Sequence, residues 1–519
     1  MQPEINTGHP RRWAILGVLV ISLLVVVLDN TVLNVALRTI ADPVRGLGAS
    51  QGELEWSINS YTLVFAGLLF TFGVIGDRWG RKRLLLVGLA LFGLASLASA
   101  YAQSPGQLVG ARALMGIGGA AIMPVTLSII SNVFDPRERG RAIGVWAGAV
   151  GLAVAIGPIV GGALLESFWW GSVFLINLPI VLAGIVAVAL LVPESRDPRP
   201  GRIDLGGVLL SVAGLVSLVY GIIDGGEHGF DRPSVWAWIG VGVAILAGFI
   251  AYERRLAYPS LDVRLFTNPR FSAAVASVGL MFFAAFGVFF FISFYLQLVR
   301  GFSPLESGLL FVPFAAAQMI FAPPSATLVK RYGAKLVCAT GLAVAGTAIA
   351  AVMFIGVDTP VWVIAVIFFA QGAGMANVMP PATEAIMSSL PREKAGVGSA
   401  VGNTVRQVGV ALGVAVFGSI VSAFYRSDLA ASLDGLPAPV RALAGESLSG
   451  AYAVAQPGSA VIAAANDAFV GGMHVAAGLA ALVAFLGAIV VLVWLPGRDR
   501  TPPVAPRADT EPAELAGVS

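Results

Sequence analysis

Charged side chains inside apolar runs are the residues of this sequence whose type and position could do chemistry. Four of them stand in such runs: Asp29, Arg112, Glu384 and Arg406. A charge at the middle of a bilayer costs about 2.5–3.5 kcal/mol, so each needs a partner or a function. From a rise of about 1.5 Å per residue, Asp29 lies roughly 12 Å and Arg112 roughly 8 Å from the same membrane face. We therefore expect Asp29 to meet Arg112, and Glu384 to meet Arg406 nearer the opposite face.

An acid and a base that meet in this way could carry a proton. An aspartate keeps its charge beside an arginine, whereas apolar surroundings favour its protonated form. A conformational change that moves Asp29 between those environments would load and release a proton. A static pair that only fixes helix packing is the alternative. For Glu384 and Arg406 both interpretations stay open, and a lone Glu384 could instead attract cationic compounds.

The composition indicates an integral membrane protein. The chain has 519 residues, is 57% hydrophobic and only 12% charged, and has a mean hydropathy of +0.85. Soluble proteins carry about 25% charged residues. The 32 Lys and Arg residues are spread between apolar runs rather than gathered on one surface, which argues against nucleic acid as a partner.

Metal, disulfide and nucleotide chemistry are not expected. The single cysteine, Cys338, excludes an intramolecular disulfide and a Cys-based zinc site, and the three His residues are scattered. The sequence contains neither a P-loop nor a dinucleotide fingerprint. We therefore expect no metal, no cofactor and no enzymatic activity, and ATP is not the expected energy source.

Fourteen apolar runs are long enough to cross a membrane, which takes about 20 residues. They cover residues 13–37, 53–76, 83–102, 107–130, 141–164, 172–193, 205–223, 234–252, 272–296, 307–329, 335–356, 360–387, 398–423 and 470–495. The first run is too long for a signal peptide, contains Asp29 and lacks a small-residue cleavage site, so we expect an uncleaved span. With the N-terminus inside, 24 Lys or Arg residues fall on the cytoplasmic side and six on the outer side. This bias predicts that both termini are cytoplasmic.

A faint internal repeat divides these spans. The turn at 77–82 (Asp-Arg-Trp-Gly-Arg-Lys) follows the second run, and a similar turn at 330–335 (Lys-Arg-Tyr-Gly-Ala-Lys) follows the tenth. Six spans, two inserted spans and six more spans are the simplest account of fourteen. The predicted parts are a cytoplasmic N-terminus (1–12), an N-terminal six-helix half (13–193), an inserted pair (203–253), a C-terminal six-helix half (272–495) with an outer loop (425–469), and a disordered cytoplasmic tail (497–519).

Four segments carry recognisable motifs. They are residues 28–37 in the first span, 73–82 in the turn after the second, 112–116 in the fourth, and Gly144, Gly157, Pro158, Gly161 and Gly162 in the fifth. These segments resemble the major facilitator superfamily, and within it the fourteen-helix drug:proton antiporters of the EmrB/QacA type. Three positions depart from that pattern: Ala153 replaces a Gly, Gly171 replaces an Arg, and Lys330 stands where the first turn has Asp.

The resemblance implies an all-α integral membrane fold, with two six-helix halves and two inserted helices, and a role for each motif. Asp77, Arg78, Gly80, Arg81 and Lys82 would fix topology and latch one conformation, with Asp77 docked on a helix N-terminus. The Gly and Pro residues of the fifth span would seal an interface between the halves and so favour antiport. Ordinary small-residue packing is the alternative there. The resemblance also supports proton coupling at the acid and base of the first and fourth spans.

Polar and aromatic residues inside the spans could line a substrate cavity. The candidates are Asn34, Tyr61, Phe290, Gln318, Gln371, Asn377 and Asn403. The aromatic residues of the run 272–296 could stack on planar compounds, although packing or lipid contact explains any single one equally well.

These observations together predict a proton-coupled multidrug efflux antiporter. It would be a monomer in the bacterial plasma membrane that exports amphipathic, cationic compounds by alternating access. Its partners would be small-molecule drugs or metabolites, protons and the lipid bilayer. A dedicated exporter of one metabolite, self-made antibiotic or lipid is the first alternative, and an uncoupled facilitator is the second.

Overall fold

A computed structural model describes residues 9–197, 203–256, 261–390, 395–456 and 458–495. Within these ranges, several side chains of 136–155 and 388–399, and that of residue 326, are not described. The described residues contain helices and turns and no strand. The predicted tail 497–519 and most of the predicted N-terminus 1–12 lie outside them.

Each predicted run falls on one long helix or on one pair of helices in line. These are α1 (Arg12–Ala41), α2 (Gln51–Trp79), α3 (Arg81–Ala100), α4 (Pro105–Val133), α5 (Pro136–Ser167), α6 and α7 (Ser172–Leu175, Asn177–Leu191), α8 (Leu205–His228), α9 (Pro233–Glu253), α10 with η2 (Pro269–Phe294, Tyr295–Val299), α11 and α12 (Pro304–Leu309, Val312–Tyr332), α13 with η3 (Ala334–Ala351, Val352–Phe354), α14 and α15 (Val361–Ala376, Met379–Ser388), α16 (Ala395–Leu429) and α19 (Ala460–Trp494). Thirteen of them are long and apolar enough in the described residues to cross a membrane. The other is α5, with 32 residues.

Short local signals set the helix boundaries. Ser50 caps α2 through its hydroxyl oxygen, which accepts from the Glu53 amide, while the Glu53 carboxylate accepts from the Ser50 amide. Ser303 and Glu306 form the same reciprocal pair at the start of α11. Each pair satisfies two amides that would otherwise lack a partner at a helix start.

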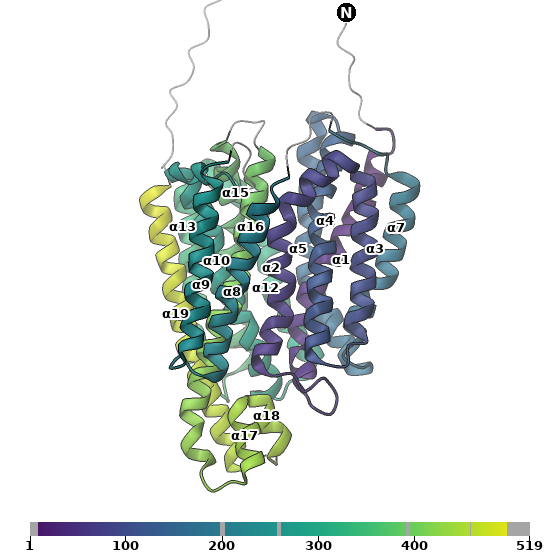
Figure 1. Cartoon of the computed structure of the whole chain (residues 1–519). Coiled ribbons are helices and arrows are strands. Elements are labelled where there is room, and N and C mark those ends of the chain that lie inside the picture. The colour runs from purple at the N-terminus through teal and green to yellow at the C-terminus, as the bar shows by residue number, and fades with distance from the viewer. Residues whose placement is uncertain (1–8, 198–202, 257–260, 391–394, 457, 496–519) are drawn as a thin grey trace, which may run out of the picture.

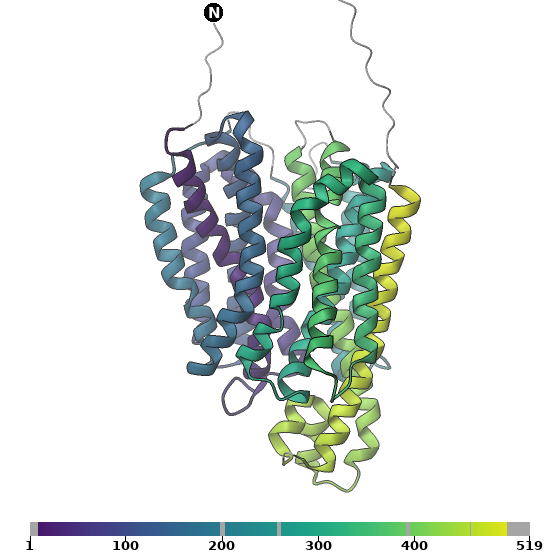
Figure 2. The same cartoon turned by 180° about the vertical axis from the view of Figure 1, so that it is seen from behind.

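The helices form two bundles that stand side by side (Figure 1). One consists of α1–α7 and the other of α10–α19, and we call them the N-terminal half and the C-terminal half. Helix α8 lies beside α2 and α16, at the junction of the two halves, and α9 packs on α8. The beginning of α1 and the end of α19 lie at the same end of the molecule (Figure 2), which we call the terminal end.

The opposite end carries a small helical cap. The predicted loop 425–469 is largely helical: α16 extends to Leu429, α19 begins at Ala460, and between them lie η5 (Ala430–Leu433), α17 (Ala438–Glu446) and α18 (Leu448–Val454). Figures 1 and 2 both show this cap protruding from the C-terminal half. We call this end the cap end.

The internal repeat is visible in two turns at the terminal end. Gly80 separates α2 from α3 and Gly333 separates α12 from α13, each as the single residue between two helices. Their φ angles are +124° and +86°, a region that residues with a side chain rarely adopt. The two halves therefore reverse the chain in the same way after their second span.

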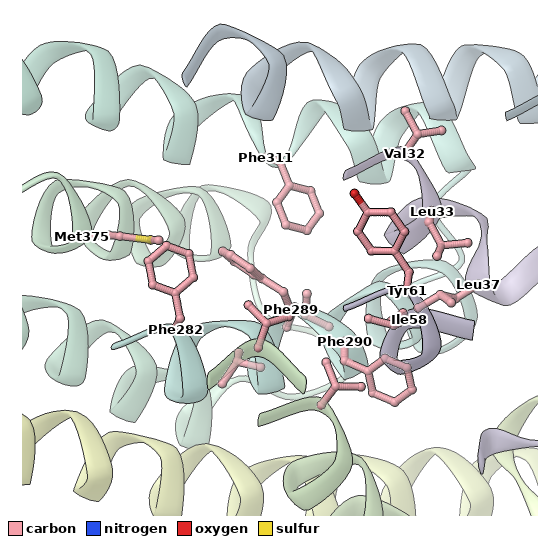
Figure 3. Packing of buried hydrophobic residues seen from close by; sticks show 14 of the residues in the cluster. Val32, Leu33, Leu37, Ile58, Tyr61, Phe282, Phe289, Phe290, Phe311 and Met375 are labelled. Carbon is pink, nitrogen blue, oxygen red and sulfur yellow. The ribbon is translucent and has the colours of Figure 1, made fainter. Parts of the chain in front are cut away.

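Apolar side chains join the two halves in one continuous core. Figure 3 shows Val32, Leu33, Leu37, Ile58 and Tyr61 of the N-terminal half close to Phe282, Phe289, Phe290, Phe311 and Met375 of the C-terminal half. The aromatic residues of α10 pack mainly on one another and on neighbouring rings, such as Phe289 on Phe314 with centroids 5.2 Å apart.

Candidate functional site

Asp29 and Arg112 form an ion pair that is buried in the N-terminal half. Arg112 Nη1 donates to Asp29 Oδ2. Arg112 is 0% exposed and Asp29 is 2% exposed. Asn177 Nδ2 donates to the other carboxylate oxygen over 3.1 Å. The predicted meeting of Asp29 with Arg112 is confirmed.

The guanidinium has further contacts on α2. Arg112 Nε donates to the Ser57 carbonyl over 3.0 Å, and the guanidinium carbon lies 4.5 Å from the centre of the Tyr61 ring. Nη2 has no hydrogen-bond partner. Arg112 is therefore held by a carboxylate, a carbonyl and an aromatic ring, while its Nη2 group makes no hydrogen bond.

Glycines allow α4 to approach α2 closely enough for these contacts. A Cβ atom on Gly116 would lie 2.6 Å from the Tyr61 carbonyl oxygen, and one on Gly119 would lie 2.8 Å from the Tyr61 hydroxyl. Such separations are too short for real side chains. The small residues of α4 thus fix the position of Tyr61 beside Arg112.

Asn177 was not predicted, and a break between α6 and α7 places it. It begins α7, just after Ile176, and its Nδ2 also donates to Ser96 Oγ over 3.0 Å. The Ser96 hydroxyl in turn donates to the Phe174 carbonyl over 2.8 Å. The available signal was a single Asn in the apolar run 172–193.

The C-terminal half does not repeat this arrangement. Among the described residues no ion pair joins Glu384 to Arg406, and the side chain of Glu384 is exposed. The guanidinium carbon of Arg406 lies 5.6 Å from the centre of the Phe282 ring, and its Nε has no hydrogen-bond partner. Arg406 also lies close enough to Tyr61 to interact with it electrostatically. The predicted meeting of Glu384 and Arg406 is therefore not found in this conformation.

Pro158 and Gly162 of α5 lie at a seam between the halves, where α5 packs on α11. A Cβ on Gly162 would lie 2.6 Å from Leu305 Cα, and Gly308 of α11 packs directly against the Pro158 carbonyl. Gly157 and Gly161 instead face α1, at Thr31 and Val32. Gly144 lies in the part of α5 whose contacts are not described.

The basic turn after α2 is built differently from the expectation. Asp77 accepts two hydrogen bonds from Arg81, over 3.0 Å and 2.8 Å, instead of docking on a helix N-terminus. Arg81 is the nearest donor because it stands four residues later, just across the turn. The carboxylate at the start of α3 belongs to Glu194, which accepts from the Lys82 amide over 3.1 Å and occupies the space left by Gly80. Arg78 also has interaction partners.

The seven predicted cavity residues are spread over both halves. Tyr61, Phe290 and Gln371 are buried, whereas Asn34, Gln318, Asn377 and Asn403 are half-buried. The amides of Asn34 and Asn377 donate to backbone carbonyls four residues earlier, and Gln371 Nε2 has no partner. Their role in binding a substrate stays a prediction.

Two hydrogen bonds between described residues join the two halves at the cap end. Gln297 Nε2 donates to the Val35 carbonyl over 2.9 Å, and Ser303 Oγ donates to Glu166 Oε1 over 2.6 Å. The seam between α5 and α11 lies at the same end. The halves are therefore in contact at the cap end in this conformation.

Comparisons with known proteins agree with this architecture. Residues 19–414 match the family described as the Major Facilitator Superfamily. The chain is 38% identical over 495 residues to the multidrug efflux pump LfrA of Mycolicibacterium smegmatis, covering 94% of this chain and 97% of that protein. It is 34% identical to the methyl viologen resistance protein SmvA of Salmonella typhimurium, covering 89% and 93%.

A solved structure supports the fold. A bacterial homologue of the human lysosomal transporter Spinster, in an inward-facing and unoccupied conformation, superposes with a TM-score of 0.65 at 19% identity. The superposition covers 93% of this chain and 98% of that one.

Proposed function

Because the chain belongs to the Major Facilitator Superfamily, a family of membrane transporters, we propose that it is a proton-coupled drug exporter. It would carry amphipathic, cationic compounds out of a bacterial cell in exchange for protons. The observation that carries this proposal is the buried Asp29–Arg112 pair, a titratable group inside the membrane-spanning bundle. The names of relatives such as LfrA and SmvA support drugs as the substrate class.

We propose that the cap end faces the outside. The charge bias of the loops supports this orientation, because Lys and Arg concentrate in cytoplasmic loops. The halves are in contact at the cap end, so the described conformation would be closed to the outside. Alternating access would then require the seam between α5 and α11 to open.

Protonation of Asp29 would change the balance that holds α1 to α4. With the carboxyl neutral, Arg112 would keep its positive charge in the interior but lose its anionic partner. A buried charge without a partner is costly, so the two helices would rearrange or water would enter. This gives a physical link between the proton and the conformation.

The membrane potential would drive exchange of a proton for a neutral cargo, whereas one-for-one exchange for a monovalent cation moves no net charge and would depend on the pH difference. One charge crossing 100 mV yields about 2.3 kcal/mol. At about 1.4 kcal/mol per tenfold concentration ratio, one proton could sustain roughly a fifty-fold gradient of a neutral cargo.

The test is ethidium efflux from proteoliposomes under an imposed pH gradient. We expect the wild type to export ethidium with the gradient, and Asp29→Asn to lose the gradient dependence while remaining folded. Asp42→Asn, in the loop after α1, is the matched control and should behave like the wild type. Gradient-independent efflux by the wild type would overturn proton coupling.

A dedicated exporter of one compound is the second candidate, because SmvA is named for a single compound, methyl viologen. A panel of cationic, neutral and anionic compounds separates the two. Competition by several unrelated cations would favour a multidrug exporter, and competition by one compound alone would favour a dedicated one.

A further inference from the structure

A second buried carboxylate lies at the cap end, where three helices of different origin meet. Glu55 of α2 is 1% exposed, and its Oε2 has no hydrogen-bond partner. Among the described residues no cation forms an ion pair with it. Gln51, one turn earlier on α2, lies within hydrogen-bonding reach.

Helix α16 of the C-terminal half covers Glu55. A Cβ atom on Gly418 would lie 2.6 Å from the Glu55 Cδ, so the carboxylate occupies the space that this glycine leaves. Glu55 belongs to the N-terminal half. It is therefore buried by the contact between the two halves, and separating α2 from α16 would expose it.

The inserted helix α8 completes this junction. Glu227 Oε1 accepts from the Gly52 amide and from Ser50 Oγ, each over 2.7 Å, which ties α8 to the start of α2. Ser419 Oγ donates to the Ile222 carbonyl over 2.9 Å, which ties α8 to α16. We call the meeting point of α2, α8 and α16 around Glu55 the cap-end junction.

The charged groups around Glu55 are mostly acids. Glu227 of α8 acts on it electrostatically, whereas Glu53, two residues earlier on α2, is exposed to solvent. Glu446 of α17 interacts with Glu227, Glu53 and His228. On α16, Arg426 interacts with Glu227. Among the described residues, no positive charge forms an ion pair with Glu55 in the closed junction.

We propose that Glu55 is a proton-binding site that couples protonation to closure of the cap-end junction. An ionised carboxylate without a partner is costly to bury, so the closed junction holds the neutral acid. When α2 and α16 separate, water reaches the carboxyl and it ionises. Acid therefore favours the closed junction and alkali favours the open one.

The role of this site in transport rests on the proposed function, in which protons enter from outside as the cargo leaves. An exporter that exchanges its cargo for protons must take each proton from outside, and the cap end is the proposed outer end. A small cavity of about 10 Å³, lined by Gln51, Ser422, Tyr425 and Glu446, among others, lies beside the junction.

The distance between the halves at the cap end tests the proposal. Val44 and Phe354 are 90% and 85% exposed and belong to opposite halves, so each accepts a spin label as cysteine after Cys338→Ala removes the single native thiol. The distance is measured in lipid nanodiscs, without drug, from acidic to alkaline pH. We expect the wild type to shift from a short to a long distance as the pH rises.

Three variants make the test specific. Glu55→Gln should hold the short distance at every pH, because a neutral side chain is never expelled by ionisation. Glu53→Gln makes the same change on the exposed side of α2 and keeps its helix-capping acceptor, so it should follow the wild type. Glu227→Gln should move the transition to lower pH, because removing a neighbouring negative charge makes Glu55 easier to ionise.

A wild-type distance that does not change with pH would overturn the proposal, as would a Glu55→Gln transition at the wild-type midpoint. Loss of the transition in Asp29→Asn, with retention in Glu55→Gln, would assign the sensor to the other carboxylate. These readings do not depend on a substrate. Failure of ethidium export therefore remains distinguishable from failure of the junction.

Discussion

The two halves of the molecule share a chain order and a glycine turn but treat buried charge in opposite ways. In the N-terminal half, Arg112 is enclosed with Asp29, a backbone carbonyl and an aromatic ring. In the C-terminal half, Arg406 lies against the Phe282 ring and near Tyr61 of the other half, without an ion pair among the described residues, and Glu384 is exposed.

This difference indicates a division of roles. In the N-terminal half the carboxylate and the guanidinium are paired with each other, so we expect protonation of Asp29 to be enough to break the pair. In the C-terminal half the Nε of Arg406 has no hydrogen-bond partner among the described residues, so we expect an acceptor from the cargo or from another conformation. A repeat in the fold therefore does not imply a repeat in the chemistry.

The largest expected effect is that of Arg112→Met. It would leave Asp29 buried without a cation, which costs about 3–5 kcal/mol in other proteins. We expect a marked fall in thermal stability together with loss of gradient-driven efflux, measured by fluorescence thermal unfolding and by ethidium transport.

Two further variants allow the stability loss in the N-terminal half to be compared with that in the C-terminal half. The double change Asp29→Asn with Arg112→Met should recover much of the stability but not the coupling. Arg406→Met in the C-terminal half should cost far less stability. Equal losses in the two halves would contradict the asymmetry.

Gly162→Val tests the seam between the halves. Its side chain would collide with the backbone at Leu305, and overpacking of this kind costs about 1–3 kcal/mol. We expect the closed cap end to loosen, so that labelled residues on either side of the seam move apart and the pH gradient is dissipated. Gly240→Val, where nothing lies within 4 Å, should change neither reading.

Arg406→Gln should alter which cargo is preferred rather than whether protons are coupled. Removing an uncompensated positive charge should favour cationic over anionic compounds by about tenfold, equivalent to about 1.4 kcal/mol. Competition between a cationic and an anionic dye in proteoliposomes measures the ratio. An unchanged ratio would mean that Arg406 does not face the cargo.

The smallest effect concerns Glu446 in the cap. Partial burial, with the nearby carboxylates of Glu227 and Glu53, raises the pKa of Glu446. Its contribution to cap stability is therefore present at acidic pH and is lost as the pH rises through that raised pKa. Glu446→Gln should remove this small loss of cap stability at alkaline pH, which hydrogen exchange of α17 and α18 can detect.

The positions of the spans could be predicted from the sequence because apolar length and basic turns are local signals. The depths of Asp29 and Arg112 below the same membrane face were likewise enough to predict their contact. Depth alone failed for Glu384, because it does not give the direction in which a side chain leaves its helix. The break between α14 and α15 at Asn377 and Val378 adds to that uncertainty.

Two buried residues of functional interest escaped the sequence for a different reason. Glu55 stands near the start of its span, where a carboxylate normally contacts water, and only the packing of α8 and α16 encloses it. The position of Asn177 is set by the break between α6 and α7, which the sequence analysis did not predict. In both cases the environment is made by segments distant in the chain.

The length of α16 and α19 has a practical consequence. Each has 35 residues, which corresponds to about 52 Å, well beyond the roughly 30 Å of a bilayer core. The surplus carries the cap, which is fastened to the C-terminal half by bonds such as Tyr425 to the Ala444 carbonyl and Tyr452 to the Leu298 carbonyl. An antibody fragment raised against α17 and α18 would therefore move with one half, mark its orientation in electron micrographs and supply the particle mass that a transporter of this size lacks.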